Sequence, residues 1–246
     1  MNIENSKGTL QNLLLKVQEQ SNRSADFLAS TSNLQKITDD EGKPQIVIEA
    51  AGGEPTRVLD VNDHAFGQIA QNVEIDTRTA RRLQEKIPHE YDGVVNALFQ
   101  KEPTNRMIRT FLDTDETSGT VRAFVSDKFK TFDNVNLLNA SLPQLMESDA
   151  QWQVVNGTVT DKRLYIRLKS EVQTGEAAVG DFMANGIGLS NSEVGAGSVQ
   201  VYQLFWTLAC LNGMQTENRN RSSHITSARD SADYGLLSGE ARIKAS

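Results

Sequence analysis

The stretch RMIRTFLDTDETSGTVRAFVSD, residues 106–127, decides the fold class because its hydrophobic residues repeat with the period of a β-strand. In its second half two sets of residues alternate along the chain: Val121, Ala123 and Val125 on one side, and Arg122, Phe124 and Ser126 on the other. Such alternation is typical of a strand with two different faces. A run of Asp, Thr, Ser and Gly divides the two halves, so the sequence predicts two strands joined by a turn.

The N-terminal side of this hairpin is predicted to be mostly helical. Apolar residues recur at helical spacing from Leu10 to Val17, and Phe27 and Leu28 continue the pattern. One β-branched run, QIVIEA at residues 45–50, interrupts the helices as a strand.

Two short helices follow the strand. Asp63 is expected to cap a helix over residues 64–75, and Asp76 or Thr77 to begin a second helix that stops at Pro88. The second helix carries three arginines, Arg78, Arg81 and Arg82, so the pair looks like a helix-turn-helix. The commoner interpretation is two packed helices with an arginine face in solvent.

The C-terminal side is predicted to be a curved antiparallel sheet packed with helices. It contains a helix over residues 134–148, strands within 151–172, and two strands around a Gly/Ser/Asn loop. We therefore expect an α+β protein with a mostly helical region over residues 1–100, a sheet core over 101–215 and a polar extension over 216–246. Whether the natural chain ends at residue 246 is left open.

Composition sets limits on function. The 246-residue chain has a net charge of −7, but residues 1–76 hold 6 Lys/Arg against 12 Asp/Glu, whereas residues 101–170 hold 10 against 9. A local basic surface in the middle of the chain is therefore compatible with the acidic total. No apolar run has the length of a membrane span, and no signal-peptide pattern is present. With Cys210 as the single cysteine, a cytoplasmic protein that does not enter a membrane is expected.

Enzyme signatures are missing from the sequence. The three histidines lie far apart, no zinc-ligand spacing occurs, and neither phosphate-binding glycine motifs nor G-x-S-x-G is found. The DTDET cluster, residues 113–117, is interpreted as a solvated turn, with a divalent-cation site as the alternative. We therefore expect a non-enzymatic protein without a cofactor or metal.

The strongest functional signal is DKRLYIRLKSE, residues 161–171. On a strand, the leucines and isoleucine of this run point to one face, and four other residues point to the opposite face: Arg163, Tyr165, Arg167 and Lys169. Cations around an aromatic ring can follow a phosphate backbone and stack a base. The alternative is an exposed face whose arginines pair with carboxylates.

A second set of candidates lies in and after the opening stretch. Arg122, Lys128, Phe129 and Lys130, with Phe132, could clamp a single strand, or the two phenylalanines could anchor the helix that follows. In the polar run at residues 218–224, Arg219 and Arg221 are expected to belong to a DNA-contacting arm or a linker. Gly195 and Gly197 lie in a loop that could approach a phosphate or be a plain hairpin.

Three segments resemble a family of phage- and plasmid-like proteins grouped as a prokaryotic domain of unknown function: VRAFVSDKFKTFDNVNLL, IGLSNSEVGAGSVQVYQLFWTLACLNGM and RNRSSH. The residues that carry the resemblance are Val125, Ser126, Asp127, Phe129, Asp133, Asn134, Asn191, Ser192, Gly195, Cys210, Asn212, Arg221 and His224. The chain departs from the pattern at Phe129, where tyrosine is usual, and lacks an arginine just before Cys210. The resemblance spans about residues 60–230 and implies a gene of mobile elements, often beside recombination and exonuclease functions.

Together these patterns predict a single-stranded-DNA-binding or annealing protein of phage or plasmid recombination. By analogy with single-strand annealing proteins, it would work as a homo-oligomer, with an exonuclease or a host replication protein as partner. The alternative is a mobile-element accessory protein that acts through protein–protein contacts with a host-defence or replication factor. The acidic N-terminal third favours that alternative.

Overall fold

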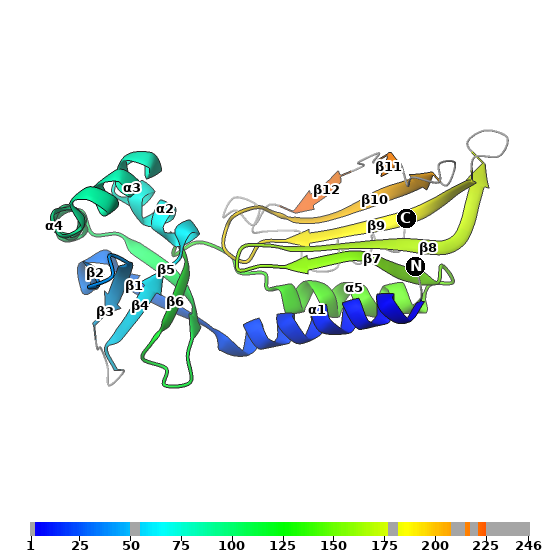
Figure 1. Ribbon diagram of the computed structural model, residues 1–246, viewed down its shortest axis with the longest axis horizontal. Helices are drawn as coiled ribbons and strands as arrows, with labels where there is room; N and C mark the ends of the chain where they lie inside the picture. The colour runs from blue at the N-terminus through cyan, green and yellow to red at the C-terminus, as the bar shows by residue number, and fades with distance from the viewer. Residues whose placement is uncertain (1–2, 50–54, 177–181, 208–214, 217–220, 225–246) are drawn as a thin grey trace. The chain divides into compact units, whose positions relative to one another are not determined.

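The computed structural model describes residues 3–49, 55–176, 182–207, 215–216 and 221–224. Within these residues it has five α-helices and two mostly antiparallel sheets, which confirms the α+β class (Figure 1). The chain forms two compact units, residues 22–129 and residues 1–21 with 130–246. The division therefore differs from the expected boundaries after residues 100 and 215, because each unit closes around its own hydrophobic core.

The 22–129 unit is a six-stranded sheet with three helices. The strand order is β1-β5-β6-β4-β3-β2, and only the β4–β6 pair is parallel. The strands are β1 (Ser24–Ser30), β2 (Leu34–Thr38), β3 (Pro44–Ile48), β4 (Arg57–Val61), β5 (Asn105–Leu112) and β6 (Gly119–Ser126). The short 3-10 helix η1 (Thr31–Asn33) precedes β2, and the helices are α2 (Asp63–Asn72), α3 (Thr77–Lys86) and α4 (Pro88–Lys101).

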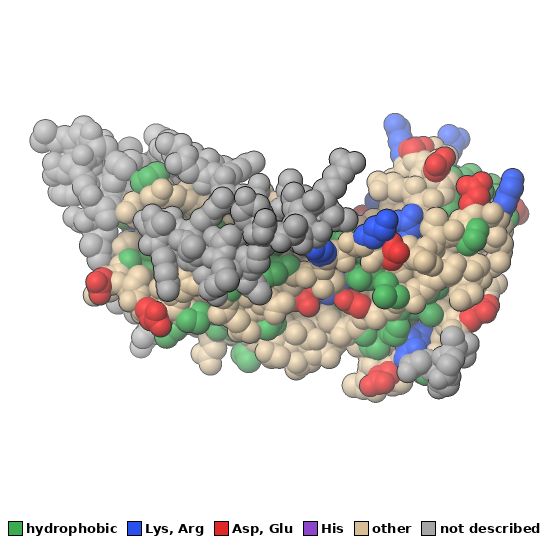
Figure 2. All heavy atoms as spheres, turned by 180° about the vertical axis from the view of Figure 1, so that it is seen from behind, with side chains coloured by type: hydrophobic (Ala, Val, Ile, Leu, Met, Phe, Trp, Pro, Cys, Tyr) green, Lys and Arg blue, Asp and Glu red, His purple; other side chains and the backbone are tan. Residues whose placement is uncertain are grey.

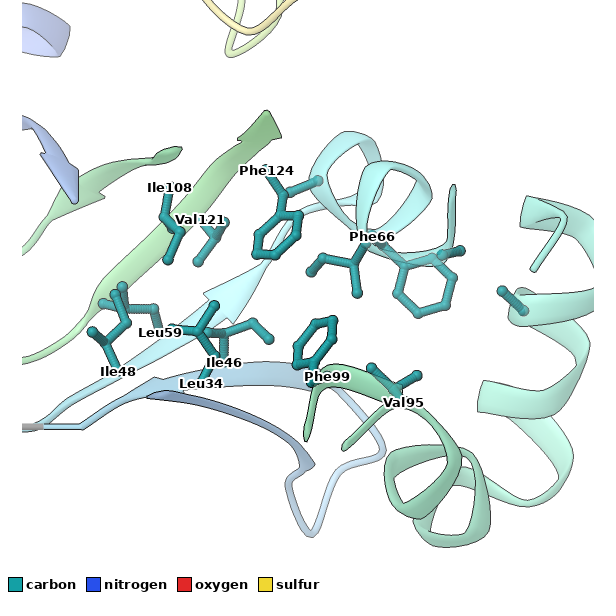
Figure 3. Packing of buried hydrophobic residues seen from close by; sticks show 14 of the residues in the cluster. Leu34, Ile46, Ile48, Leu59, Phe66, Val95, Phe99, Ile108, Val121 and Phe124 are labelled. Atoms are coloured by element: carbon teal, nitrogen blue, oxygen red, sulfur yellow. The ribbon is translucent and has the colours of Figure 1, made fainter. Parts of the chain in front are cut away.

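The core of this unit lies between the sheet and its helices. Figure 3 shows Phe99 of α4 directed toward the strand residues Ile46 and Phe124, and Phe66 of α2 belongs to the same cluster. The rings of Phe99 and Phe124 stack with their centroids 6.0 Å apart. This packing fixes the helices to the sheet, so the positions of α2 and α4 follow from residues that the sequence marks as apolar.

The region before residue 100 holds more strand than the sequence pattern predicted. Helix α1 (Ile3–Arg23) contains the apolar residues from Leu10 to Val17 as predicted, but it ends before Phe27 and Leu28, which lie in β1 rather than in a helix. β1 pairs antiparallel with β5 along its whole length, and the Asp26 carboxylate accepts a hydrogen bond from Arg109 Nε at 2.9 Å. The partner strand lies about 80 positions away, so local spacing did not reveal the pairing.

Strand β6 contains a β-bulge at Arg122. In the register Arg109 is opposite Ala123, whereas Thr110 is opposite Val121, which leaves Arg122 as the extra residue. The bulge breaks the simple alternation, so that Val121 and Phe124 both belong to the hydrophobic core. The expectation that Phe124 lies on the opposite face from Val121 is therefore wrong.

The other unit is a single antiparallel sheet with two helices on one face. Its strands are β7 (Trp152–Val159), β8 (Leu164–Glu176), β9 (Phe182–Asn191), β10 (Val199–Thr207), β11 (Gln215–Thr216) and β12 (Arg221–His224). The order is β11-β10-β9-β8-β7, and β12 also pairs with β10. Helix α1 and helix α5 (Asn134–Glu147) pack their leucines against β7, β8 and β9, as Figure 1 shows beneath the strands.

This layered packing leaves the opposite face of the β7–β10 sheet without a helix among the described residues. α1 approaches β7 closely at Gly157, because a Cβ there would be 3.1 Å from Leu13 Cδ2. None of the helices in the described segments is both long enough and apolar enough to cross a membrane. The predicted polar extension is described only at 216 and 221–224; residues 225–246 lie outside the described residues.

Candidate nucleic-acid interface

The alternation predicted for strand β8 is present. Leu164, Ile166 and Leu168 are buried in the core formed with α1 and α5, each with 3% or less of its surface exposed. On the opposite face Tyr165 is 41% exposed, Arg163 is exposed, and Arg167 and Lys169 are half-buried. A half-buried lysine or arginine packs its methylene stem on the sheet and keeps its charged head in water.

The same face continues across β9 and β10 and contains one aromatic residue that the sequence analysis missed. Arg167 pairs in register with Gly188, and Gly188 pairs with Tyr202. A Cβ on Gly188 would fall inside the Tyr202 ring, so the ring lies directly over the glycine. The ring of Tyr202 is thereby brought from β10 toward Arg167 of β8. The sequence feature that indicates this position is a glycine opposite an aromatic residue, and it can be recognised only once the register is known.

We call the set of Arg163, Tyr165, Arg167, Lys169 and Tyr202 the aromatic–basic face. Its neighbours in register on β7 are polar: Asn156 and Thr158 lie opposite Arg167 and Tyr165, and both are exposed. Beside Lys169 the face is apolar, because Lys169 pairs with Gly186 and Gly186 pairs with Leu204, which is 2% exposed. Of the two C-terminal arginines, Arg221 occupies the β12 position opposite Tyr202, while Arg219 lies outside the described residues.

Arg163 is held at one end of the aromatic–basic face. Its Nη1 donates to the Tyr165 hydroxyl at 2.7 Å, and its Nη2 donates to the carbonyl of Ala196 in the β9–β10 loop. Gly197 makes room for this contact, since a Cβ there would be 3.0 Å from Nη2. The glycine-rich loop therefore orients Arg163 and, through it, Tyr165. The sequence analysis predicted a phosphate-approaching loop or a plain hairpin and did not predict this role.

Arg122, expected on the outward face of its strand, is instead buried with 1% of its surface exposed. Its guanidinium lies over the Phe111 ring, 3.9 Å from the centroid. Because the bulge directs this side chain into a packed position, Arg122 does not belong to a nucleic-acid-binding surface. This corrects the sequence-based assignment.

The remaining residues of the proposed clamp lie in the segment of chain between β6 and α5. Lys128 and Phe129 close the 22–129 unit, Lys130 opens the other, and both lysines are exposed. Phe129 is half-buried, and Phe132 packs against the core of the β7–β10 unit. The lysines are therefore accessible, whereas Phe132 acts as the anchor of α5 that the alternative interpretation described.

Several residues that carry the family resemblance take part in a hydrogen-bond network. Asn191 Nδ2 donates to the carbonyl of Phe132 at 2.8 Å and to Asn134 Oδ1 at 3.0 Å. The backbone N–H of Asn134 donates to Glu193 Oε1 at 2.7 Å. The N-cap residue Asp133 makes no side-chain capping bond, so the glutamate of the β9–β10 loop satisfies the first turn of α5 instead. These hydrogen bonds connect the N-terminus of α5 to the end of β9 and the β9–β10 loop.

No metal site emerges from the described part of the chain, where no group of three or more His, Cys, Asp or Glu side chains could hold an ion. Asp113 and Asp115 of the DTDET cluster accept hydrogen bonds from Ser118, and Asp113 also pairs with Arg23 at 2.9 Å. Hydrogen bonds from Ser118 and Thr117 lower the pKa of the Asp115 carboxyl. The cluster thus serves the β5–β6 turn.

Comparison with known proteins gives no match: no family model fits the chain, and no curated protein or solved structure is similar to it. The resemblance to the phage- and plasmid-like family therefore stays a prediction. The functional argument consequently depends on the geometry of the aromatic–basic face.

Proposed function

We propose that the chain binds single-stranded DNA on the aromatic–basic face and acts, without an enzymatic activity of its own, as a single-strand-binding or annealing protein. The observation that carries the proposal is the exposed Tyr165 between Arg163 and Arg167, on a strand whose other face is core. The resemblance to proteins of mobile elements, itself a prediction from the sequence, points to the same assignment.

The chemistry of this face suits an unpaired strand. An exposed tyrosine ring can stack on a base, which is worth roughly 1–3 kcal/mol per base, and stacking is open to any of the four bases. Arg167 and Lys169 supply cations for phosphates, with Tyr202 as a second ring beside them. In a duplex the bases are stacked on one another and are not free to meet a side chain, so a single strand is favoured.

The scaffold holds these side chains in fixed positions. β8 pairs with β7 on one side and β9 on the other, and its inward residues are anchored in the core. Alternate residues of a strand are about 7 Å apart, so Tyr165, Arg167 and Lys169 form a regular row, and Arg163 directly precedes the strand. A row on a rigid sheet loses little conformational freedom when it binds an extended chain.

The test measures fluorescence anisotropy of a labelled 30-nucleotide single strand at 50 and 200 mM salt. We expect Tyr165→Ala to weaken binding about 5- to 150-fold, the range that one lost base stack implies. Arg167→Ala should weaken binding and flatten the dependence of log affinity on log salt by about 0.7, the value of one phosphate contact.

Lys16→Ala is the matched control, because Lys16 is an exposed cation on α1, which covers the other face of the sheet. It should bind as the wild type does. Folded wild-type protein that does not bind the oligonucleotide at 50 mM salt would exclude the proposal, as would equal losses for Lys16→Ala and Arg167→Ala.

Further parts of the proposal depend on the resemblance. Lys128 and Lys130, both exposed, would add phosphate contacts in the segment that follows β6. The protein would be cytoplasmic and act as a homo-oligomer, with an exonuclease or a host replication protein as partner.

A second candidate function is that of an accessory protein that acts through protein–protein contacts. The observation that favours it is apolar surface on the helical layer: Leu15 of α1 is 63% exposed and Met146 of α5 is 84% exposed. Exposed apolar side chains of this size are available for contact with a partner protein. A chain that fails to bind single strands but remains folded would favour this function.

A further inference from the structure

Helices α2 and α3 of the 22–129 unit have the construction of a helix-turn-helix. α2 ends at Asn72 and α3 begins at Thr77, so four residues make the turn. Glu74 in this turn has a φ of +57°, the left-handed conformation that a sharp reversal between helices requires. Asp76 then caps α3, its carboxylate accepting hydrogen bonds from the backbone N–H of Arg78 at 2.9 Å and of Thr79 at 3.3 Å.

The residues that the two helices and their turn contribute to the core are apolar. They comprise Ile69 and Ala70 of α2, Val73 and Ile75 of the turn, and Ala80 and Leu83 of α3, all in or against the core cluster. Ala70 and Ala80 are completely buried and small, which permits a close approach of the helices. Gly67 faces the start of α3, since a Cβ there would be 3.5 Å from Thr77 Cγ2.

The outward face of α3 is basic. Arg78, Arg82 and Lys86 follow at intervals of four residues and therefore form one stripe, with Arg81 beside it, and all four are exposed. Only Glu85 among the α3 residues is acidic; it pairs with Lys86 at 3.0 Å, and Arg81 pairs with Asp63 of α2 at 2.6 Å. Figure 2 shows such basic side chains projecting from the part of the molecule that carries α2–α4.

A helix with this composition does little for the core. Ala80 is its one fully buried residue, and four of its ten residues carry positive charge in a chain whose net charge is −7. In a helix-turn-helix the second helix lies in the major groove, with residues of its N-terminal half near the base edges. Arg78 and Thr79 occupy those positions here, with Arg82 one turn further along, and arginine is the side chain that most often contacts guanine there.

We propose that α2 and α3 form a helix-turn-helix that binds duplex DNA, with the Arg78–Arg82–Lys86 stripe of α3 directed into the major groove. This site lies in a different unit from the aromatic–basic face and does not depend on it. The protein would then bind a duplex through one unit and a single strand through the other.

The test compares two double variants of equal charge change. Arg78→Ala/Arg82→Ala removes two cations from the stripe, whereas Lys43→Ala/Lys101→Ala removes two exposed cations elsewhere in the same unit. Binding to a labelled 30-base-pair DNA duplex is measured by anisotropy at 50 and 200 mM salt. We expect the stripe variant to lose at least tenfold in duplex affinity and to retain its single-strand affinity and melting temperature. The control should bind the duplex within twofold of wild type.

The proposal fails if the wild type does not bind the duplex at 50 mM salt, or if both double variants lose affinity equally. It also fails if an RNA duplex of the same sequence binds as tightly as DNA, since the major groove of RNA is too narrow for a helix. The single-strand measurements separate these results from a failure of the aromatic–basic face, whose variants lie in the other unit.

Discussion

At the scale of single residues, the 22–129 unit contains a tyrosine that its surroundings keep neutral. Tyr91 of α4 is 1% exposed, and among the described residues no group hydrogen-bonds with its hydroxyl. Burial, with a smaller effect of the Asp92 carboxylate, raises the pKa of Tyr91 to about 12. The ring itself is well placed, 6.2 Å from Phe66 and beneath the Lys36 ammonium at 4.7 Å.

We predict that Tyr91→Phe is as stable as wild type or more stable at pH 7, because it removes a buried hydroxyl without a partner and keeps both ring contacts. Because the folded state keeps Tyr91 neutral up to a pKa of about 12, whereas the unfolded chain ionises at about 10, the stability of the wild type is unaffected below pH 10. It then falls as pH rises from about 10 to about 12. Over that window the wild type should lose roughly 3 kcal/mol more than the variant. Urea unfolding at pH 7, 10 and 11.5 measures both effects; a variant with the same alkaline loss as wild type would contradict the assignment.

At the scale of elements, a buried ion pair attaches the edge strand β2 to helix α4. The Lys36 ammonium donates to the Asp92 carboxylate and to Gln84 Oε1 of α3 at 2.7 Å. Asn96 accepts from the Lys36 backbone N–H at 2.7 Å and donates to its carbonyl at 2.8 Å. Burial lowers the pKa of the Lys36 ammonium, and Asp92 opposes that shift. The helix thus satisfies the open edge of the sheet.

Breaking this pair from one side should be costly. We predict that Lys36→Met lowers the free energy of unfolding by about 3–5 kcal/mol, because it leaves the Asp92 carboxylate buried without its cation. Lys36→Met/Asp92→Leu should recover most of that loss. Lys43→Met, which breaks the exposed pair with Glu41, is the control and should leave stability unchanged. Chemical denaturation of the four proteins decides; a double variant as unstable as Lys36→Met would argue against the mechanism.

The same elements show what the sequence could predict. The β5–β6 hairpin, the β8 alternation and the Asp76 cap were predicted because each depends on residues close in sequence. The pairing of β1 with β5, the bulge at Arg122 and the Tyr202 ring over Gly188 were missed. Each of these depends on the register between strands that are distant in sequence. The spacing of residues along a single strand does not determine that register.

At the scale of the whole molecule, both sheets have open edges. β1 pairs only with β5 and β7 only with β8 among the described strands, and Leu28 of β1 is 69% exposed. An open edge with exposed apolar side chains is a ready site for pairing with another chain. This observation supports the proposed homo-oligomer.

We predict that the protein elutes as an oligomer and that Leu28→Lys lowers its mass, because a charge on an edge strand opposes edge-to-edge pairing. Light scattering coupled to size-exclusion chromatography, with and without a single strand, measures the mass. Thr56→Lys, a surface change outside the edge strands, is the control. A monomer under both conditions would exclude the homo-oligomer.

The ring of Tyr202 over Gly188 has a consequence for the evolution of this chain. Any side chain at position 188 would displace the ring, so the two positions are constrained as a pair and not separately. Related chains should therefore keep glycine at 188 wherever an aromatic residue stands at 202, and should lose both together. Chains that have lost both residues would be those in which the ring at position 202 no longer has a function.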